Sequence, residues 1–236
     1  DVNAALNALR TQAGGTLAGL VLDLRRNPGG SLDEAVALSD LFLDKGQIVS
    51  QRGRNRGDTI YYEAETVYRG DDAADVPMIV LIDVGSASAS EIVAGALQDQ
   101  HRALIMGERS FGKGSVQTLL PLAQDAALKL TTARYYTPSG RSVQEGGIKP
   151  DIRVPQLSDP DAATRSQYAM RESDLRRHLV NEVDLEDEAL ETDRQVDPRF
   201  TATAEELEAQ GVKDFQLDYA LKTLRRTGAG VLTARR

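Results

Sequence analysis

The sequence predicts an α/β fold, because short apolar runs typical of buried strands alternate with longer amphipathic segments typical of helices. Two of the apolar runs are residues 17–24 (LAGLVLDL) and 77–84 (PMIVLIDV), and each leads into a turn rich in Gly or Ser. A segment with helical periodicity follows each turn. Strands and helices that alternate in this way, with Gly-rich turns at the strand ends, indicate an α/β domain.

The N-terminal elements have their own start and stop signals. Residues 1–13 have the pattern of the end of a helix, which a Gly-Gly pair terminates. After the first strand, residues 25–30 (RRNPGG) form a tight loop. Ser31 then begins a helix, because Ser31 and Glu34 have the spacing of a capping box.

The middle of the chain continues the alternation. Residues 53–65 (GRNRGDTIYYEAE) are expected to form a hairpin or an extended arm, and residues 91–100 (EIVAGALQDQ) a helix. Further strands are expected at residues 47–51, 102–108, 115–122 and 127–136. The turn at 137–142 (TPSGRS) follows the last of these strands.

The character of the chain changes after Pro155, which predicts a core domain over residues 1–155 and a helical extension over residues 156–236. Residues 162–180 are expected to form a helix, and the acidic run at 181–193 a solvated linker. The last expected helix covers residues 214–226, where four apolar residues recur at helical spacing. These residues are Leu217, Ala220, Leu221 and Leu224.

Composition excludes several classes of function. The chain has 236 residues and a net charge of −8, which argues against broad binding to nucleic acids or anionic membranes. It has no apolar run of membrane-spanning length and no cysteine, so a cysteine nucleophile, thiolate metal ligands and disulfides are absent. With only two histidines, the sequence predicts neither a metal site nor a cofactor. Nucleophilic catalysis would more naturally pair serine with lysine.

Residues 107–117 (GERSFGKGSVQ) almost match the phosphate-binding loop G-x-x-x-x-G-K-[ST]. Gly114 occupies the position where that loop requires a hydroxyl for Mg²⁺. A phosphate loop must also begin a helix, whereas a β-type run that contains Pro121 follows here. The motif therefore argues against nucleotide binding and leaves Lys113 as either a solvated surface lysine or a residue with another role.

Residues 85–91 (GSASASE) place three serines where a strand gives way to a helix. A serine at a helix N-terminus has free N–H groups and a favourable dipole beside it, which suits a nucleophile with an oxyanion hole. Ser88 and Glu91 also have capping-box spacing, and the pattern alone favours a helix cap. Ser86 and Ser90 are equally available by this reasoning.

The NPGG loop is the second candidate for backbone chemistry. Gly29 and Gly30 precede a helix and could present N–H groups to an oxyanion. They could equally be needed only for a turn with positive φ.

Three long segments together resemble the bacterial C-terminal processing peptidases, also called tail-specific proteases. They are GLVLDLRRNPGGSLDEAVALSDLFL (19–43), GSASASEIVAGALQDQHRALIMGERSFGKGSVQ (85–117) and LKLTTARYYTPSGRSVQEGGIKPDI (128–152). The resemblance covers about residues 1–155. It implies a crotonase/ClpP-like α/β core that carries a Ser-Lys dyad.

The resemblance also implies a role for each matching residue. Ser88 would be the nucleophile and Lys113 the general base, which works only when the amine is neutral. Gln117 would orient the lysine, and the two residues share a face if this run is a regular strand. The oxyanion donors would be the N–H of Ala89 and that of Gly29 or Gly30.

Asp99 lies on the same predicted helix as Ser88 and is a further residue that could be considered for catalysis. Eleven residues along a helix span about 16 Å, which is too far for contact with Ser88. A structural role is therefore expected for Asp99.

The family resemblance also implies additional domains, substrates and binding partners. Its usual N-terminal helical segment and PDZ domain are missing from this chain, so a fragment is expected. Protein or peptide substrates with exposed C-terminal tails, a homo-oligomer, an adaptor protein and an extracytoplasmic location are expected on the same basis. Two other readings stay open: a crotonase-like acyl-transfer enzyme, and a catalytically silent binding scaffold.

Overall fold

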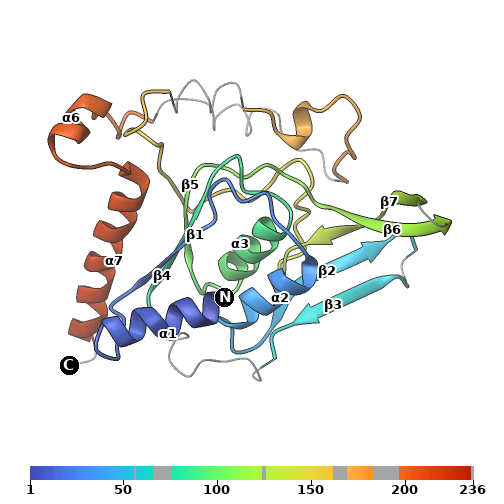
Figure 1. The fold of residues 1–236 in the computed structure, drawn as a ribbon, viewed down its shortest axis with the longest axis horizontal. Helices are drawn as coiled ribbons and strands as arrows, with labels where there is room; N and C mark the ends of the chain where they lie inside the picture. Colours follow the sequence, from blue (N-terminus) through green and yellow to red (C-terminus); the bar gives the residue numbers. More distant parts are fainter. Residues whose placement is uncertain (56, 66–75, 124–125, 162–168, 183–196, 235–236) are drawn as a thin grey trace.

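The computed structural model describes residues 1–55, 57–65, 76–123, 126–161, 169–182 and 197–234. They form a mixed α/β fold with two four-stranded sheets (Figure 1). The first sheet is parallel, in the order β1-β4-β5-β8. Its strands are β1 (Leu20–Asp23), β4 (Met78–Ile82), β5 (Leu104–Gly107) and β8 (Ile152–Arg153).

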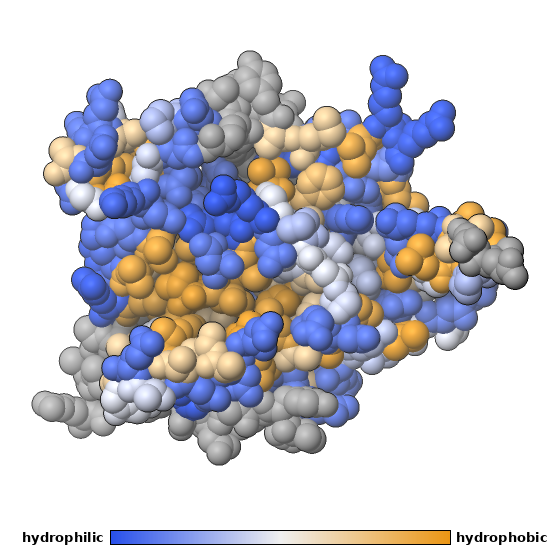
Figure 2. All heavy atoms as spheres, in the orientation of Figure 1, coloured by the Kyte–Doolittle hydropathy of each residue, from blue (hydrophilic) through white to orange (hydrophobic). Residues whose placement is uncertain are grey.

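The second sheet is antiparallel, in the order β3-β2-β7-β6. Its strands are β3 (Thr59–Glu63), β2 (Gln47–Gly53), β7 (Ala126–Tyr136) and β6 (Ser115–Ala123). β6 and β7 form a long hairpin that projects from the body of the molecule (Figure 1). Apolar side chains gather at its outer end (Figure 2), where the exposed leucines are Leu119, Leu120, Leu122, Leu128 and Leu130.

Helices pack on both faces of the parallel sheet. α2 (Leu32–Asp40) and α3 (Ala89–Asp99) share one hydrophobic cluster with β4, and α7 (Phe215–Ala234) joins a second cluster. Successive side chains of a strand point to opposite faces, so β4 serves both clusters. Met78, Val80 and Ile82 belong to the first cluster, and Ile79 and Leu81 to the second.

Two further helices each bury one leucine, which is Leu6 of the first hydrophobic cluster in one helix and Leu207 in the other. α1 (Val2–Gln12) ends before a pair of glycines with positive φ, and α6 (Ala204–Ala209) begins at the capping residue Thr203. None of the described helices has the length and apolar character needed to cross a membrane.

The predicted alternation of strands and helices is confirmed from α1 to β7. Ser31 caps α2 by accepting the Glu34 N–H at 3.2 Å, and residues 53–65 belong to the β2–β3 hairpin as expected. The mixed α/β class is therefore correct, and it includes an antiparallel sheet that the sequence did not distinguish.

The helix predicted over residues 162–180 is wrong in the part that the structure describes. Residues 169–180 contain only a 3-10 turn, Glu172–Asp174, while residues 162–168 lie outside the described residues. The helix face was predicted from Tyr168, Leu175 and Leu179. Leu175 is 36% exposed and Leu179 is only partly buried, while Tyr168 lies outside the described residues. Arg171 and Glu172 are buried instead, and hydrogen bonds to the core replace those of a helix. The predicted acidic linker lies mostly in residues 183–196, also outside the described residues.

The C-terminal helix is confirmed, with one exception to its predicted face. Ala220 and Leu224 are buried against Ile79, Leu81 and Met106, whereas Leu221 is 43% exposed. The stripe in contact with the sheet is thus narrower than the four predicted residues.

Candidate active site

The turn between β4 and α3 distinguishes its three serines by their hydrogen bonds. Ser86 is fully buried and donates to the Leu24 carbonyl at 2.7 Å. Ser90 is also buried and donates to the Asn27 carbonyl at 3.0 Å. Among the described residues, the Ser88 hydroxyl has no hydrogen-bond partner, and the residue is partly exposed. Ser86 therefore attaches the turn to Leu24 just beyond β1, Ser90 attaches it to Asn27 of the NPGG loop, and the Ser88 hydroxyl stays available.

The backbone of Ser88 is strained. Its φ of 56° and ψ of −115° put a non-glycine residue in a sparsely populated region, which costs about 1–3 kcal/mol and is often found at active sites. A nucleophilic serine on a tight strand-to-helix turn is presented in this way. Ser88 directly precedes α3, whose first N–H, that of Ala89, has no acceptor in a preceding helical turn.

The NPGG loop lies directly against this turn. Gly29 has a φ of +91°, and a Cβ built on it would lie 2.6 Å from the Ala87 carbonyl oxygen and 2.7 Å from the Ala89 nitrogen. Only glycine allows so close an approach. The Gly29 N–H donates to the Asn27 side chain at 3.0 Å, whereas the Gly30 N–H has no partner among the described residues.

The loop that carries Lys113 connects β5 to β6. Gly112 has a φ of +97° and a Cβ there would lie 2.6 Å from the Glu145 carbonyl oxygen, so glycine is required. Ser86 accepts the Phe111 N–H through its carbonyl at 3.0 Å, which ties the loop to the serine turn. Lys113 is partly buried, and no phosphate-binding helix follows, in agreement with the argument against a nucleotide site.

Glu91 joins the serine turn to the lysine loop. Its side chain is fully buried, and Oε2 accepts the N–H of Ser88 at 2.8 Å and that of Lys113 at 2.9 Å. Oε1 accepts the Ser110 hydroxyl at 2.6 Å and the Gly112 N–H at 2.7 Å. The backbones of the two predicted catalytic residues thus share one acceptor atom, which places them within two hydrogen-bond lengths of each other.

Burial raises the pKa of Glu91 to about 7, against the opposing effect of its four hydrogen bonds. Sequence reasoning saw Glu91 only as a capping residue. It accepts the Ser88 N–H at 2.8 Å as such a residue would, and the Glu91 N–H donates to the Ser88 carbonyl at 2.9 Å. The sequence did contain a signal for this buried role, because Glu91 is a carboxylate on an otherwise apolar helix face.

Gln117 lies on β6, four residues after Lys113, and its side chain is exposed. The strand begins only at Ser115, and its pairing with β7 shifts register between Val116 and Gln117. Lys113 and Gln117 were expected to share a face only if this run were a regular strand. That condition is not met, because Lys113 precedes β6 and a bulge changes the side-chain alternation. Among the described residues, no hydrogen bond joins the two side chains.

Asp99 lies at the far end of α3 from Ser88. Its carboxylate accepts the Ser139 N–H at 2.9 Å and pairs with Arg141 at 2.6 Å. Burial would raise its pKa, but the hydrogen bonds of the 137–141 turn and the charge of Arg141 lower it overall. The structural role expected for Asp99 is confirmed.

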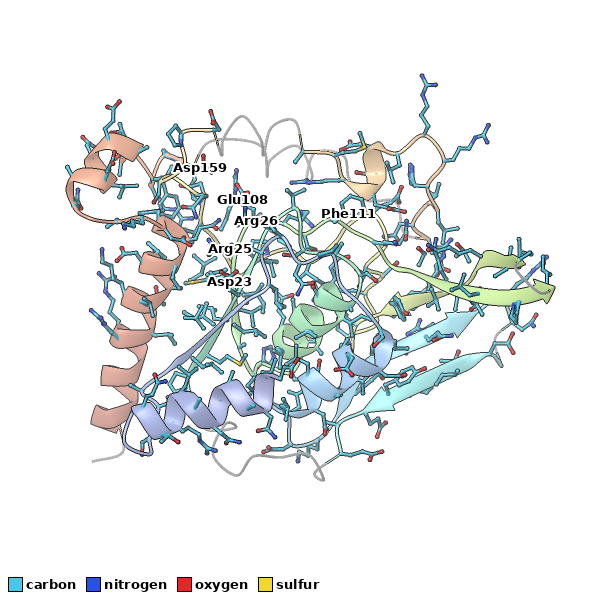
Figure 3. The ribbon with its side chains drawn as sticks, in the orientation of Figure 1. Asp23, Arg25, Arg26, Glu108, Phe111 and Asp159 are labelled. Atoms are coloured by element: carbon cyan, nitrogen blue, oxygen red, sulfur yellow. The ribbon has the colours of Figure 1, made fainter. Side chains whose placement is uncertain are left out.

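A polar cavity of about 590 Å³ lies at the carboxyl ends of the parallel strands, between them and the start of α7. Asp23, Arg25, Arg26 and Glu108 line it (Figure 3). Arg25 pairs with Asp23 at 2.7 Å and with Asp214 at 2.6 Å, so its charge is already neutralised. The lining includes Gly85 but neither Ser88 nor Lys113.

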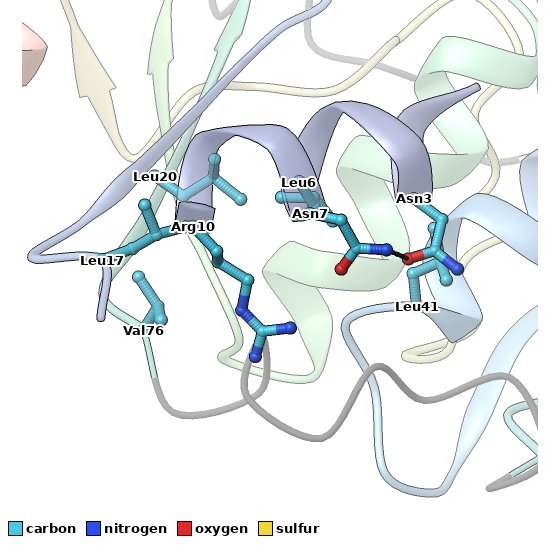
Figure 4. Close-up of a pocket in the computed structure, with 8 residues that line it drawn as sticks. All are labelled: Asn3, Leu6, Asn7, Arg10, Leu17, Leu20, Leu41 and Val76. Carbon is cyan, nitrogen blue, oxygen red and sulfur yellow. Dashed lines mark hydrogen bonds between the residues drawn. The ribbon is translucent and has the colours of Figure 1, made fainter. Parts of the chain in front are cut away.

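A second recess lies beneath α1 (Figure 4). It is lined mainly by apolar side chains, and its volume of about 10 Å³ suits at most one water molecule. It is therefore not a binding site for a substrate. No group of three or more His, Asp or Glu side chains suited to a metal ion occurs in the part of the chain that the structure describes.

Comparisons with known proteins identify the family to which residues 1–154 belong. The sequence model of peptidase family S41 matches residues 1–154, which include Ser88, Glu91 and Lys113. The carboxy-terminal-processing protease of Bartonella bacilliformis is 52% identical over 180 residues, which cover 76% of this chain and 41% of that protein. A probable CtpA-like serine protease of Staphylococcus epidermidis is 38% identical over 135 residues, 57% of this chain and 27% of that protein.

Among solved structures, the photosystem II D1 C-terminal processing protease superposes with a TM-score of 0.57 at 37% identity. The match covers 65% of this chain and 38% of that protein. This chain thus spans about two fifths, or less, of the length of the relatives it matches.

Proposed function

Because this chain belongs to peptidase family S41, we propose that it carries the catalytic centre of a serine endopeptidase with Ser88 as nucleophile and Lys113 as general base. The observation that carries the proposal is the difference in hydroxyl hydrogen bonding among the three serines of one turn. The Ser86 hydroxyl bonds Leu24 just beyond β1, and the Ser90 hydroxyl bonds Asn27 of the NPGG loop. The Ser88 hydroxyl makes no cap hydrogen bond and lies on strained backbone at the start of α3.

The chemistry follows from these positions. A neutral Lys113 amine takes the proton of Ser88 as its oxygen attacks the substrate carbonyl. The resulting ammonium then protonates the leaving amine, and an acyl-enzyme forms. Water, activated by the same amine, hydrolyses this ester and restores the serine.

We assign the oxyanion donors to Ala89 and Gly30. The Ala89 N–H begins α3, where the helix dipole favours negative charge. Gly29 brings the two loops together by its close contact with Ala89, but its own N–H is used by Asn27. The Gly30 N–H has no such partner among the described residues, which makes it the better donor.

Gln117 is assigned the orientation of the Lys113 amine on the strength of the family resemblance. The assignment requires the Gln117 amide oxygen to reach across the bulge between Val116 and Gln117. An extended substrate could add to the free edge of β6, which leads away from Lys113.

The names of the relatives suggest the substrate class. A processing protease that acts near carboxyl termini would take protein chains with exposed C-terminal tails, as expected from the sequence. An extracytoplasmic location is proposed on the same resemblance.

Replacement of Lys113 by Ala tests the proposed dyad. We expect the rate at which a fluorophosphonate labels Ser88 to fall by at least about 10³-fold, because the hydroxyl then lacks its base. Casein cleavage should fall in parallel. The circular dichroism spectrum should not change, since the amine makes no hydrogen bond among the described residues.

Two variants complete this experiment. Ser88→Ala should abolish labelling, and Lys129→Ala, which removes an exposed lysine on β7, should leave it unchanged. Labelling of Lys113→Ala at the wild-type rate would refute the dyad.

A further inference from the structure

We propose that residues 172–181 of the C-terminal extension are a positioning element of the proposed active site, which holds the Lys113 loop in place through Gln144 and Glu145. The inference rests on the proposed function, because it concerns the base of that reaction. It assigns a catalytic contribution to a segment beyond the 1–154 region that the peptidase family model matches.

Glu172 holds the lysine loop on both sides of Lys113. Its N–H donates to the Phe111 carbonyl at 3.2 Å, two residues before the lysine. Its carboxylate accepts from the Gln144 amide at 3.1 Å, and Gln144 in turn accepts the Gly114 N–H at 3.1 Å. Gln144 is fully buried and Glu172 nearly so, which makes these polar contacts costly to lose.

Residues 178–181 form hydrogen bonds with Gln144 and Glu145, the core residues that contact the lysine loop. Asn181 donates to the Gln144 carbonyl at 2.7 Å through its side chain and to the Glu145 carboxylate through its backbone N–H. Glu145 has a φ of 62° and donates its own N–H to the Gly112 carbonyl at 2.8 Å. Each contact thus ends on a residue that directly holds the loop.

His178 makes the contact with Glu145 sensitive to pH. Its Nε2 lies 2.5 Å from the Glu145 carboxylate and its Nδ1 lies 2.5 Å from the Leu175 carbonyl. Both partners are acceptors, so both contacts are hydrogen bonds only when the ring carries two protons. The Leu175 carbonyl and the carboxylates of Glu145 and Glu172 raise the pKa of His178 accordingly. The hydrogen bonds of His178 to Glu145 and to Leu175 are therefore both present below the ordinary histidine pKa. They weaken as pH rises through the raised pKa of His178.

The experiment measures fluorophosphonate labelling of Ser88 in the full chain from pH 6 to pH 9. At pH 6, His178→Asn should label about tenfold more slowly than wild type, because a displaced base loses activity steeply. The ratio of wild-type to variant rate should shrink towards one at pH 9, where the wild-type ring has lost its charge. A variant that only reduced the amount of folded protein would not show this dependence.

We call the contacts of residues 172–181 with the Lys113 loop, Gln144 and Glu145 the brace. Matched variants distinguish loss of the brace from a general loss of stability. Glu172→Ala should slow labelling at every pH, and Glu172→Gln, which keeps an acceptor oxygen, should restore it. His101→Asn replaces an exposed histidine and should label like wild type throughout. Equal rates for wild type and His178→Asn at pH 6, together with a normal rate for Glu172→Ala, would overturn the inference.

Amide hydrogen exchange tests the brace without any need for activity. The N–H groups of Lys113 and Gly114 should exchange about tenfold faster in Glu172→Ala and unchanged in His101→Asn. If the folded wild type does not label at all, the proposed function fails and exchange alone decides on the brace. Unchanged exchange at both amides in Glu172→Ala would refute it.

Discussion

At the scale of single residues, Glu91 is a fully buried carboxyl group that holds the backbones of Ser88 and Lys113, the two residues of the proposed dyad. All four of its partners are donors, so the ionised carboxylate satisfies them best, while complete burial favours the protonated form. The balance sets a pKa of about 7, well above the ordinary value of 4.5. The serine turn and the lysine loop of the proposed dyad are therefore joined by a group whose pKa lies near neutral pH.

Glu91→Gln should reduce the pH dependence of stability. Because the native pKa is raised, the native state holds a proton that the unfolded chain releases, and this stabilisation is full below pH 4.5 and lost as pH rises through about 7. Urea unfolding of the wild type at pH 5 and pH 8 should show this dependence, up to about 3 kcal/mol. The glutamine variant should lack it, and an equal dependence in both proteins would contradict the assignment.

The same substitution should slow labelling of Ser88. A glutamine presents an NH₂ group where two donors now point, which leaves buried N–H groups unsatisfied at about 1–3 kcal/mol each. The serine turn and the lysine loop would then separate. A folded Glu91→Gln protein that labels at the wild-type rate would show that this link has no part in positioning.

At the scale of elements, the NPGG loop assigns different tasks to its two glycines. Gly29→Ala would place a methyl group 2.6 Å from the Ala87 carbonyl at a positive φ, whereas a Cβ on Gly30 has nothing within 4 Å. We expect Gly29→Ala to destabilise the fold by about 1–3 kcal/mol and to displace the Ala89 N–H. Gly30→Ala should keep both stability and labelling, because it retains the backbone N–H.

Thermal unfolding and labelling rates of the two variants check this difference. Loss of labelling in Gly30→Ala with unchanged stability would mean that the site has less room around Gly30 than the structure shows. Wild-type stability of Gly29→Ala would contradict the close packing of the two loops.

The elements also show where sequence reasoning succeeds and where it stops. Periodicity located β4 and α3 because burial of β4 on both faces leaves an unbroken apolar run. Only the family resemblance implied that Ser88, Ala89 and the two glycines form one site. Periodicity could not choose among the three serines, because their hydrogen bonds to Leu24 and Asn27 depend on a loop more than sixty residues away in the chain.

Residues 169–180 illustrate the opposite case. Their composition favours a helix, but the buried contacts of Glu172 with Gln144 and Phe111 outweigh local propensity. Such contacts join residues far apart in the chain and leave no periodic signal. The bulge in β6 was hidden for the same reason, since it arises from pairing with β7.

At the scale of the whole molecule, the C-terminal extension belongs to the same packed body as the parallel sheet. Leu224 is buried against β4 and β5, and Asp214 at the start of α7 pairs with Arg25 beyond the end of β1. Burial alone would raise the pKa of Asp214, but the hydrogen bonds from Arg25 and Gln156 lower it to about 2. An ionic contact just before α7 and apolar contacts near its middle thus attach this helix to the core.

This attachment predicts that residues 1–155 and 156–236 unfold together, although the sequence divides the chain between them. Leu224→Ala should lower the free energy of unfolding of the whole chain by about 2–4 kcal/mol, since it opens a cavity beneath α7. Leu221→Ala, on the exposed side of the same helix, should change it by less than about 0.5 kcal/mol. Far-ultraviolet circular dichroism and proteolysis of the core should report one shared transition in urea. The prediction fails if α7 unfolds first and the core of Leu224→Ala keeps the wild-type urea midpoint, because the extension is then a separate folding unit. In that case residues 172–181 must hold the Lys113 loop without help from α7.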